Sequence, residues 1–170
     1  MPRYQWSALN KQQVGAFTEY FVKMELTMYG FEVYGTEVDD RGIDFVARRH
    51  GAPFIEVQVK SLRSYGYVFM QKTKFEIRES VYLALGLLFD NQEPRLYLIP
   101  AIVWKQPNQV FVGRNYDVPG LKSKPEWGIN LSKKNMPAIE AFAFEAVVGR
   151  LGAQNRRLSF LQARASDRFF

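Results

Sequence analysis

The stretch Val81–Phe89 constrains the fold of this chain more than any other segment. Every residue in it is aliphatic, aromatic or glycine. An uninterrupted apolar run of this length is typical of a central strand that is buried on both faces. The chain is therefore expected to build a sheet around this strand, with other elements packed against it.

The segments on either side of this run predict helices and further strands. Apolar residues recur at helical spacing from Asn10 to about Tyr29, with Asn10 as the N-cap and Gly30 as the stop. A second helix is expected from residue 135 to about residue 149. Strands are expected over residues 31–37, 43–49, 54–60, 67–71, 95–104 and 110–112. This order predicts a mixed α/β or α+β sheet flanked by helices.

A length of 170 residues suits one domain with one core, which we expect over residues 1–150. Residues 151–170 are expected to form a basic tail or helix. If residues 151–168 were helical, one side would carry four arginines, Arg150, Arg157, Arg164 and Arg168, and would lie along DNA or against another subunit. A flexible basic tail is the alternative.

Composition excludes several kinds of chemistry. The chain has no cysteine and a single histidine, His50, which lies in an expected turn. Disulfide frameworks, thiolate zinc sites, cysteine nucleophiles and histidine-based triads are therefore not expected. The net charge of +6 favours a polyanionic partner such as nucleic acid. Because the start of the chain is not a secretory signal and most apolar runs are shorter than a bilayer span, we expect a cytoplasmic protein with no membrane partner.

The first predicted hairpin carries the residues that point to a chemical function. Side chains alternate along a strand, so Glu56, Gln58 and Lys60 share one face. Asp44 lies on the neighbouring strand and approaches that face if the two strands pair across the turn at residues 50–53. Carboxylate and amide oxygens suit a hard cation such as Mg²⁺, and an ammonium group beside them neutralises charge on a phosphate.

The alternative is that this face is an ordinary solvated surface, for which glutamate and lysine are common residues. Two observations oppose that alternative. Asp44 follows a turn and is surrounded in sequence by apolar residues, a poor setting for an idle exposed acid. Glu19 shares a helix face with Gly15, Val22 and Leu26, so this carboxylate needs a partner or a function, or else pairs with Lys23 four residues on.

Taken in order, three motifs resemble the PD-(D/E)XK nuclease superfamily. They are Gly15-x-x-x-Glu19 on the first helix, Gly42-Ile43-Asp44, and Glu56-Val57-Gln58-Val59-Lys60-Ser61. The resemblance covers roughly residues 11–104 and is nearest to the branch of archaeal Holliday-junction resolvases and Mrr-type restriction endonucleases. It implies a restriction-endonuclease-like fold, a mixed central β-sheet of four or five strands flanked by helices.

The resemblance also implies roles for single residues. Asp44 would be the metal ligand, Lys60 the catalytic lysine and Glu19 the glutamate of the first helix. Gln58 stands where the family usually has its second acid. Glutamine also occurs at this position in the Mrr-type branch. Since glutamine brings no charge, Glu56 or Glu19 would supply the missing carboxylate. Residues expected to contact nucleic acid follow the site strand: Ser61, Arg63, Ser64, Gln71, Lys72 and Lys74. A solvated loop is the alternative for these residues.

These expectations lead to three hypotheses of function. The first is a Mg²⁺-dependent (or Mn²⁺-dependent) DNA endonuclease of restriction-like, junction-resolving or homing type, assembled as a homodimer or higher homo-oligomer. The second is a catalytically inactive nuclease-fold module that binds nucleic acid, favoured by Gln58. The third is a protein-interaction module, such as a toxin or antitoxin partner, in which the hairpin is only surface.

Overall fold

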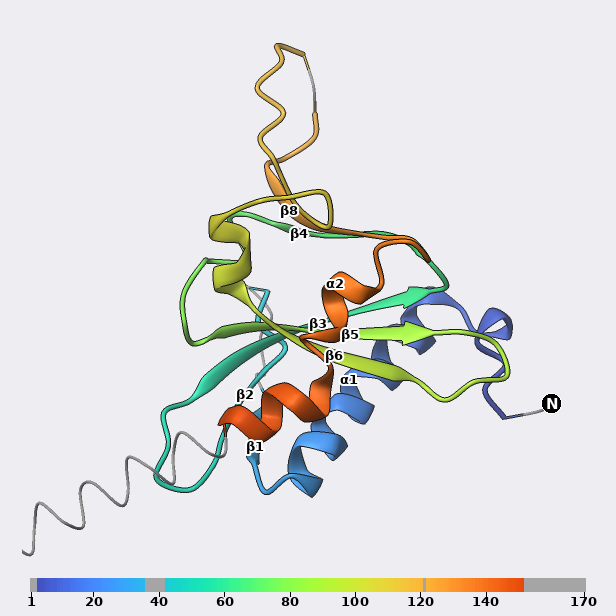
Figure 1. The fold of residues 1–170 in the computed structure, drawn as a ribbon, viewed down its shortest axis with the longest axis vertical. Helices are drawn as coiled ribbons and strands as arrows, with labels where there is room; N and C mark the ends of the chain where they lie inside the picture. Colours follow the sequence, from blue (N-terminus) through green and yellow to red (C-terminus); the bar gives the residue numbers. More distant parts are fainter. Residues whose placement is uncertain (1–2, 36–41, 121, 152–170) are drawn as a thin grey trace, which may run out of the picture.

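The computed structural model describes residues 3–35, 42–120 and 122–151, which are built around a five-stranded sheet (Figure 1). In spatial order the sheet consists of β1 (Glu32–Gly35), β2 (Phe45–Arg48), β3 (Ile55–Arg63), β5 (Val81–Leu88) and β6 (Arg95–Pro100). β3 and β5 run parallel, while the other neighbouring strands are antiparallel. The predicted mixed central sheet is therefore confirmed.

β5 is buried along its whole length, as the apolar run predicts. Leu83 and Leu85 point into one core cluster, and Tyr82 and Ala84 point into the other. The sheet is thus covered on both faces, and β5 is the strand that packs against a hydrophobic core on each side.

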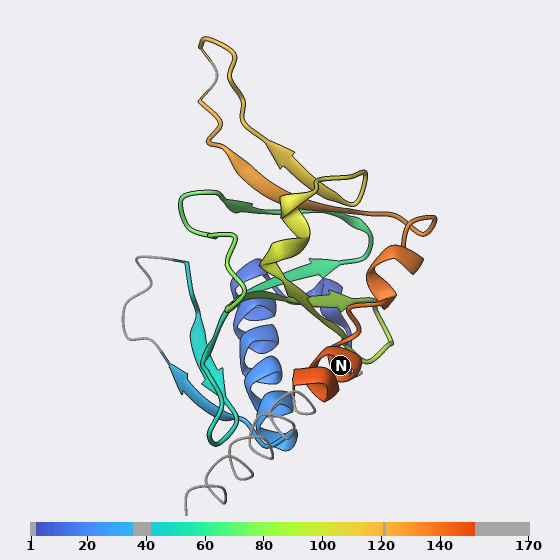
Figure 2. The same cartoon turned by 60° about the vertical axis from the view of Figure 1, so that its left-hand side comes forward.

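Helix α1 (Lys11–Met28) covers one face of the sheet (Figure 2). Its N-terminus has a capping box, in which the Asn10 side chain accepts from the Gln13 backbone and the Gln13 side chain accepts from the Asn10 backbone, both at 2.9 Å. Val22 and Leu26 are fully buried in the cluster that contains Phe45. The expected start and end of this helix are confirmed.

A second sheet, which the sequence does not predict as a unit, lies over the opposite face. It contains β4 (Gly66–Gln71), β8 (Glu126–Leu131) and β7 (Phe111–Arg114), in that order. Met70 and Ile129 pack into the cluster that contains Leu83. Two short 3-10 helices, η1 (Trp6–Ala8) and η2 (Ala101–Lys105), complete the layers, and Trp104 of η2 donates from Nε1 to the Gly128 carbonyl at 3.0 Å.

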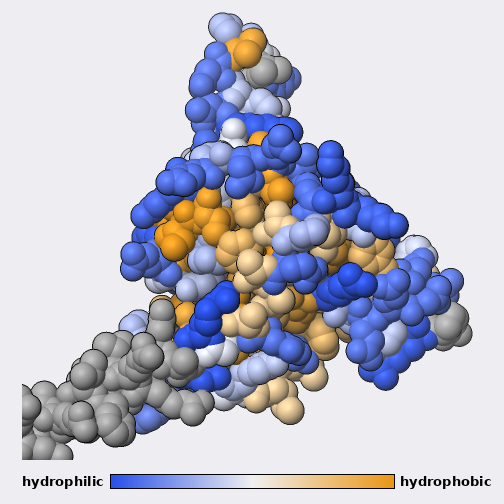
Figure 3. All heavy atoms as spheres, viewed as in Figure 1, coloured by the Kyte–Doolittle hydropathy of each residue, from blue (hydrophilic) through white to orange (hydrophobic). Residues whose placement is uncertain are grey.

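The chain between β7 and β8 projects away from the second sheet (Figures 1 and 2). Its surface is largely hydrophilic (Figure 3). The described residues of this projection, 115–120 and 122–125, belong to none of the hydrophobic core clusters.

The predicted second helix is interrupted. It consists of α2 (Pro137–Glu140) and a further helical segment over residues 144–151. Between them the Phe142 carbonyl accepts from Leu98 N at 2.9 Å, and Ala143 forms a β-bridge with Tyr97. The single continuous helix was a wrong prediction, because the open edge of β6 takes backbone groups that a helix would use internally.

No helix in the described ranges is long and apolar enough to cross a membrane. The predicted basic tail or helix falls almost entirely on residues 152–170, which lie outside the described residues.

The contact between α1 and β5 depends on Gly86. A Cβ atom there would lie 2.5 Å from Cγ2 of Thr18, a residue that is 1% exposed. We expect Gly86→Ala to lower the free energy of unfolding by about 1–3 kcal/mol through overpacking, measured by urea denaturation.

Gly15→Ala is the matched control, since a Cβ at Gly15 has nothing within 4 Å and the residue lies inside α1. It should raise the free energy of unfolding by roughly 0.5–1 kcal/mol, the helix preference of alanine over glycine. A Gly86→Ala protein as stable as the wild type would show that the α1–β5 contact is looser than described.

Candidate active site

The pairing of β2 with β3 brings Asp44 to the predicted face of the hairpin. Phe45 pairs with Val57, so Asp44 stands opposite Gln58. Asp44 N donates to the Val57 carbonyl at 3.0 Å, and Val59 N donates to Asp44 Oδ2 at 2.5 Å. The carboxylate is thus fixed to the backbone of β3 by a charge-assisted hydrogen bond.

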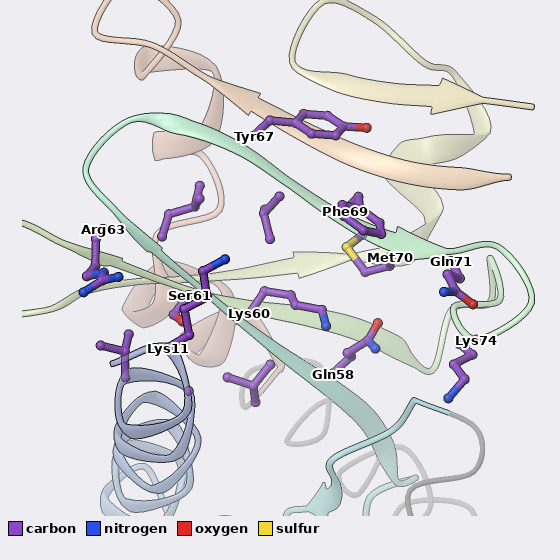
Figure 4. Close-up of a pocket in the computed structure, with 15 residues that line it drawn as sticks. Lys11, Gln58, Lys60, Ser61, Arg63, Tyr67, Phe69, Met70, Gln71 and Lys74 are labelled. Atoms are coloured by element: carbon purple, nitrogen blue, oxygen red, sulfur yellow. The ribbon is translucent and has the colours of Figure 1, made fainter. Parts of the chain in front are cut away.

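A cleft of about 680 Å³ lies between β3 and β4 (Figure 4). Gln58 and Lys60 line it from β3, while Phe69 and Gln71 line it from β4. Among the described residues, the charged ones in its lining are all basic: Lys11, Lys60, Arg63 and Lys74. Such a cleft attracts anions, because like charges on low-dielectric walls focus the electric field.

Gln58 is the least satisfied polar residue of the cleft. It is 6% exposed, and its Oε1 atom is buried without a hydrogen-bond partner among the described residues. A buried acceptor without a donor costs about 1–3 kcal/mol. A cation or a hydrogen-bond donor bound in the cleft would remove that cost.

Glu56 shares the strand face of Gln58 but is already engaged. Its two carboxylate oxygens accept from the guanidinium of Arg78 at 3.0 and 2.9 Å, and Ser80 Oγ donates to it at 3.1 Å. The hydrogen bond from Arg78 to this carboxylate raises the pKa of Arg78. Sequence reasoning missed Arg78, because the pairing of β3 with β5 brings it to Glu56 from a distant turn.

Glu19 is paired with Lys23, which was the alternative to a functional role in the sequence analysis. It forms an ion pair with Lys23 at 2.6 Å, one turn along α1. Gly15, one turn earlier on the same face, does line the cleft, whereas Glu19 is outside the lining.

The predicted nucleic-acid contacts divide into two groups. Ser61, Arg63, Gln71 and Lys74 line the cleft, whereas Ser64 and Lys72 do not. Arg63 also donates to the Leu9 carbonyl at 2.6 Å. Lys72 lies 3.9 Å from the ring centroid of Trp127 and donates to Asn115, so its ammonium group has a structural role.

Several cleft residues were not predicted as site residues, among them Lys11 and Phe69. Lys11 begins α1 and Phe69 lies on β4, far from the site strand in sequence. Only the packing of α1 and the second sheet against β3 brings them together, so no local pattern marks them.

The residues present fit a cation only in part. Asp44 and Gln58 offer a carboxylate and an amide oxygen, the ligands that Mg²⁺ prefers. Among the described residues no three histidine, aspartate or glutamate side chains gather into a metal-binding group. The proposed roles of Glu19 and Glu56 as further ligands stay predictions, since both are paired with basic residues.

Comparisons with known proteins identify the fold. No protein-family model and no curated protein sequence matches the chain. Among solved structures, the bacterial homing endonuclease I-Ssp6803I is similar over 87% of this chain and 98% of its own, with 14% identity and a TM-score of 0.51. The Holliday junction resolvase Hjc of Archaeoglobus fulgidus matches 79% of this chain and 95% of its own, with 15% identity and a TM-score of 0.49.

The chain therefore has the restriction-endonuclease-like fold, which is the fold of the PD-(D/E)XK nuclease superfamily. This confirms the resemblance predicted from the three motifs at the level of the fold.

Gly42 shapes the site, since a Cβ there would lie 2.8 Å from the Lys74 carbonyl and 3.0 Å from Gln58 Nε2. Its φ of 75° favours glycine. We expect Gly42→Ala to lower the free energy of unfolding by about 1–2 kcal/mol for the left-handed backbone and by a further ~1–3 kcal/mol for overpacking. Urea denaturation measures the sum.

Gly51→Ala is the matched control, because Gly51 has nearly the same φ, 74°, and no atom within 4 Å of a Cβ. It should show only the backbone cost. Equal losses in the two variants would mean that Gly42 does not press on Gln58 and Lys74.

Proposed function

We propose that this protein is a DNA endonuclease that hydrolyses phosphodiester bonds in the cleft between β3 and β4. One observation carries the proposal: Asp44 stands opposite Gln58, while Gln58 and Lys60 line a cleft whose charged residues, among those that the structure describes, are all basic. Asp44 itself lies behind Gln58, outside the lining. The likeness to a homing endonuclease supports it, since that protein shares the fold.

Asp44 and Gln58 are the residues that would hold Mg²⁺ or Mn²⁺. The Asp44 carboxylate supplies the charge, and Gln58 Oε1, which has no hydrogen-bond partner among the described residues, supplies a neutral oxygen. When bound, the ion would supply Lewis acidity at the phosphate.

Lys60 is proposed to stabilise the charge that grows on the phosphate during hydrolysis. It lies two residues after Gln58 on the same strand face and lines the cleft. An ammonium group in a partly desolvated site stabilises such charge more strongly than in water. Lys11, Arg63 and Lys74 would hold the flanking phosphates, which fixes the DNA without reading its sequence.

DNA is the proposed substrate, and a homodimer or higher homo-oligomer is the proposed assembly. One cleft holds one set of catalytic residues, so cutting both strands of a duplex at one place calls for two copies.

The proposal is tested by nicking of plasmid, branched and single-stranded DNA with and without Mg²⁺. Asp44→Ala and Lys60→Ala are each expected to slow nicking by about 10²–10³-fold, the usual effect of removing one charge-stabilising group. Asp117→Ala and Lys105→Ala, which change residues outside the cleft lining, should leave the rate unchanged. Nicking that survives both site substitutions would refute the site.

A second candidate is a nucleic-acid-binding module without cleavage. Gln58 in place of an acid and the capture of Glu56 by Arg78 favour it, because both reduce the charge available to a cation. Salt-sensitive DNA binding without nicking under any divalent ion would support this module. A protein that binds no DNA or RNA would instead support the interaction-module hypothesis.

The role of Gln58 has its own test. Gln58→Glu adds a carboxylate opposite Asp44, in a position that is 6% exposed. Without divalent ions the melting temperature should fall, because the new buried carboxylate and the half-buried Asp44 carboxylate repel each other. Mg²⁺ should then raise it more than in the wild type, since a ligand that binds the folded state stabilises it.

Gln58→Met, which keeps the size but removes the oxygen, should abolish the Mg²⁺-dependent rise. The measurement is the melting temperature of the wild type, Gln58→Glu and Gln58→Met at increasing Mg²⁺ concentration. The same response in all of them would rule out Gln58 as a ligand.

A further inference from the structure

The outer wall of the cleft carries an exposed aromatic ring. Phe69 is 48% exposed and lines the cleft. The next residue, Met70, also lines the cleft, but it is 1% exposed and packs in the core. β4 is the edge strand of the second sheet, so no further strand of that sheet lies between Phe69 and β3. Figure 4 shows Phe69 on the β4 side of the cleft and Gln58 and Lys60 on the β3 side, with Met70 drawn between them.

The ring is supported by Tyr67 on the same side of β4. The two rings are stacked, with centroids 6.4 Å apart and planes 20° apart. Tyr67 is fixed in turn, because its hydroxyl donates to Glu126 at 2.6 Å and the Arg114 guanidinium lies 4.6 Å from its ring centroid. Tyr67 also lies close over Gly128, where a side chain would collide with its hydroxyl. Phe69 is therefore presented on a rigid support.

A nucleotide matches the two walls of the cleft. Lys60 and Lys74 offer positive charge for a phosphate, and Phe69 offers a flat apolar face. Aromatic side chains beside a basic groove bind nucleic acid by stacking on bases. In an intact duplex a base presents only its edge to the grooves, because its faces are covered by its neighbours. Stacking on Phe69 therefore needs a base that has left the helical stack.

We propose that Phe69 is a stacking platform for an unpaired base, so that the preferred substrate carries an unpaired nucleotide beside the phosphate held by Lys60. This inference rests on the proposed function, since it assigns a substrate class to the same cleft. It adds Phe69 as a residue that determines specificity, with Tyr67 as its positioning residue.

Charge argues against a second copy of the chain as the occupant of the cleft. Every charged residue that the structure describes in the lining is basic, so a like-charged surface would be repelled. A polyanion with an exposed ring face can bind the lysines through its phosphate and stack on Phe69 at the same time.

The test is binding to a duplex with one unpaired 2-aminopurine, compared with a fully paired duplex of the same sequence, without divalent ions so that the strands stay intact. The wild type should bind the first duplex about tenfold or more tightly, the range of one base–aromatic stack, and should quench its fluorescence. Phe69→Ala should lose both the preference and the quenching, and Phe69→Trp should retain them.

Two further variants separate stacking from other effects. Phe69→Leu keeps an apolar side chain but should not quench. Phe54→Ala removes a ring that is 42% exposed and outside the cleft lining, so it should behave as the wild type. Tyr67→Phe removes the hydroxyl that bonds Glu126, and a weakened preference with unchanged binding to the paired duplex would assign it the positioning role.

The outcomes distinguish this inference from the proposed function. Salt-sensitive binding that is equal for the two duplexes, in the wild type and in Phe69→Ala alike, overturns the stacking platform and leaves the nuclease proposal standing. A folded Phe69→Ala protein that loses affinity equally for both duplexes also overturns it. A wild-type protein that shows no salt-sensitive DNA binding overturns both.

Discussion

Burial of β5 on both faces is the constraint on which the rest of the structure depends. A strand hidden on two sides needs a layer over each face, and α1 and the second sheet supply these layers. The two faces of the neighbouring strand β3 also meet these two layers. Its Val57 side chain points into the α1 layer, while Gln58 and Lys60 face the second sheet. The cleft exists because the second sheet meets the polar face of β3 without closing over it.

Sequence reasoning recovered the parts of the fold that are written in local patterns. The apolar run, the capping box at Asn10 and the alternation in β3 each depend on residues a few positions apart. The second sheet was missed as a unit because β4 and β8 are joined by a long stretch of chain, and nothing local pairs them. The break before residue 144 was missed for the same reason, since the edge of β6 causes it.

The candidate site divides in the same way. The approach of Asp44 to Gln58 follows from one hairpin and was predictable from its spacing. The engagement of Glu56 by Arg78 and the presence of Lys11 and Phe69 in the cleft depend on contacts between distant segments. Such contacts are fixed by packing rather than by spacing. Glu19 shows what a local pattern cannot decide. Its position on the helix face is compatible with a functional role and with an ion pair to Lys23, and the structure contains the ion pair.

The short turn from β3 to β4 has a consequence for how such a protein changes over generations. The chain passes from Arg63 to Gly66 through two residues, Ser64 with its φ of 68° and Tyr65, so the two walls of the cleft are successive strands. The wall with Gln58 and Lys60 is tied to the most buried strand of the molecule, whereas the other wall is the free margin of a separate sheet. Substitutions of its exposed residues, such as Phe69, leave the central packing intact. Selection can therefore alter what the cleft accepts while the opposite wall is inherited unchanged.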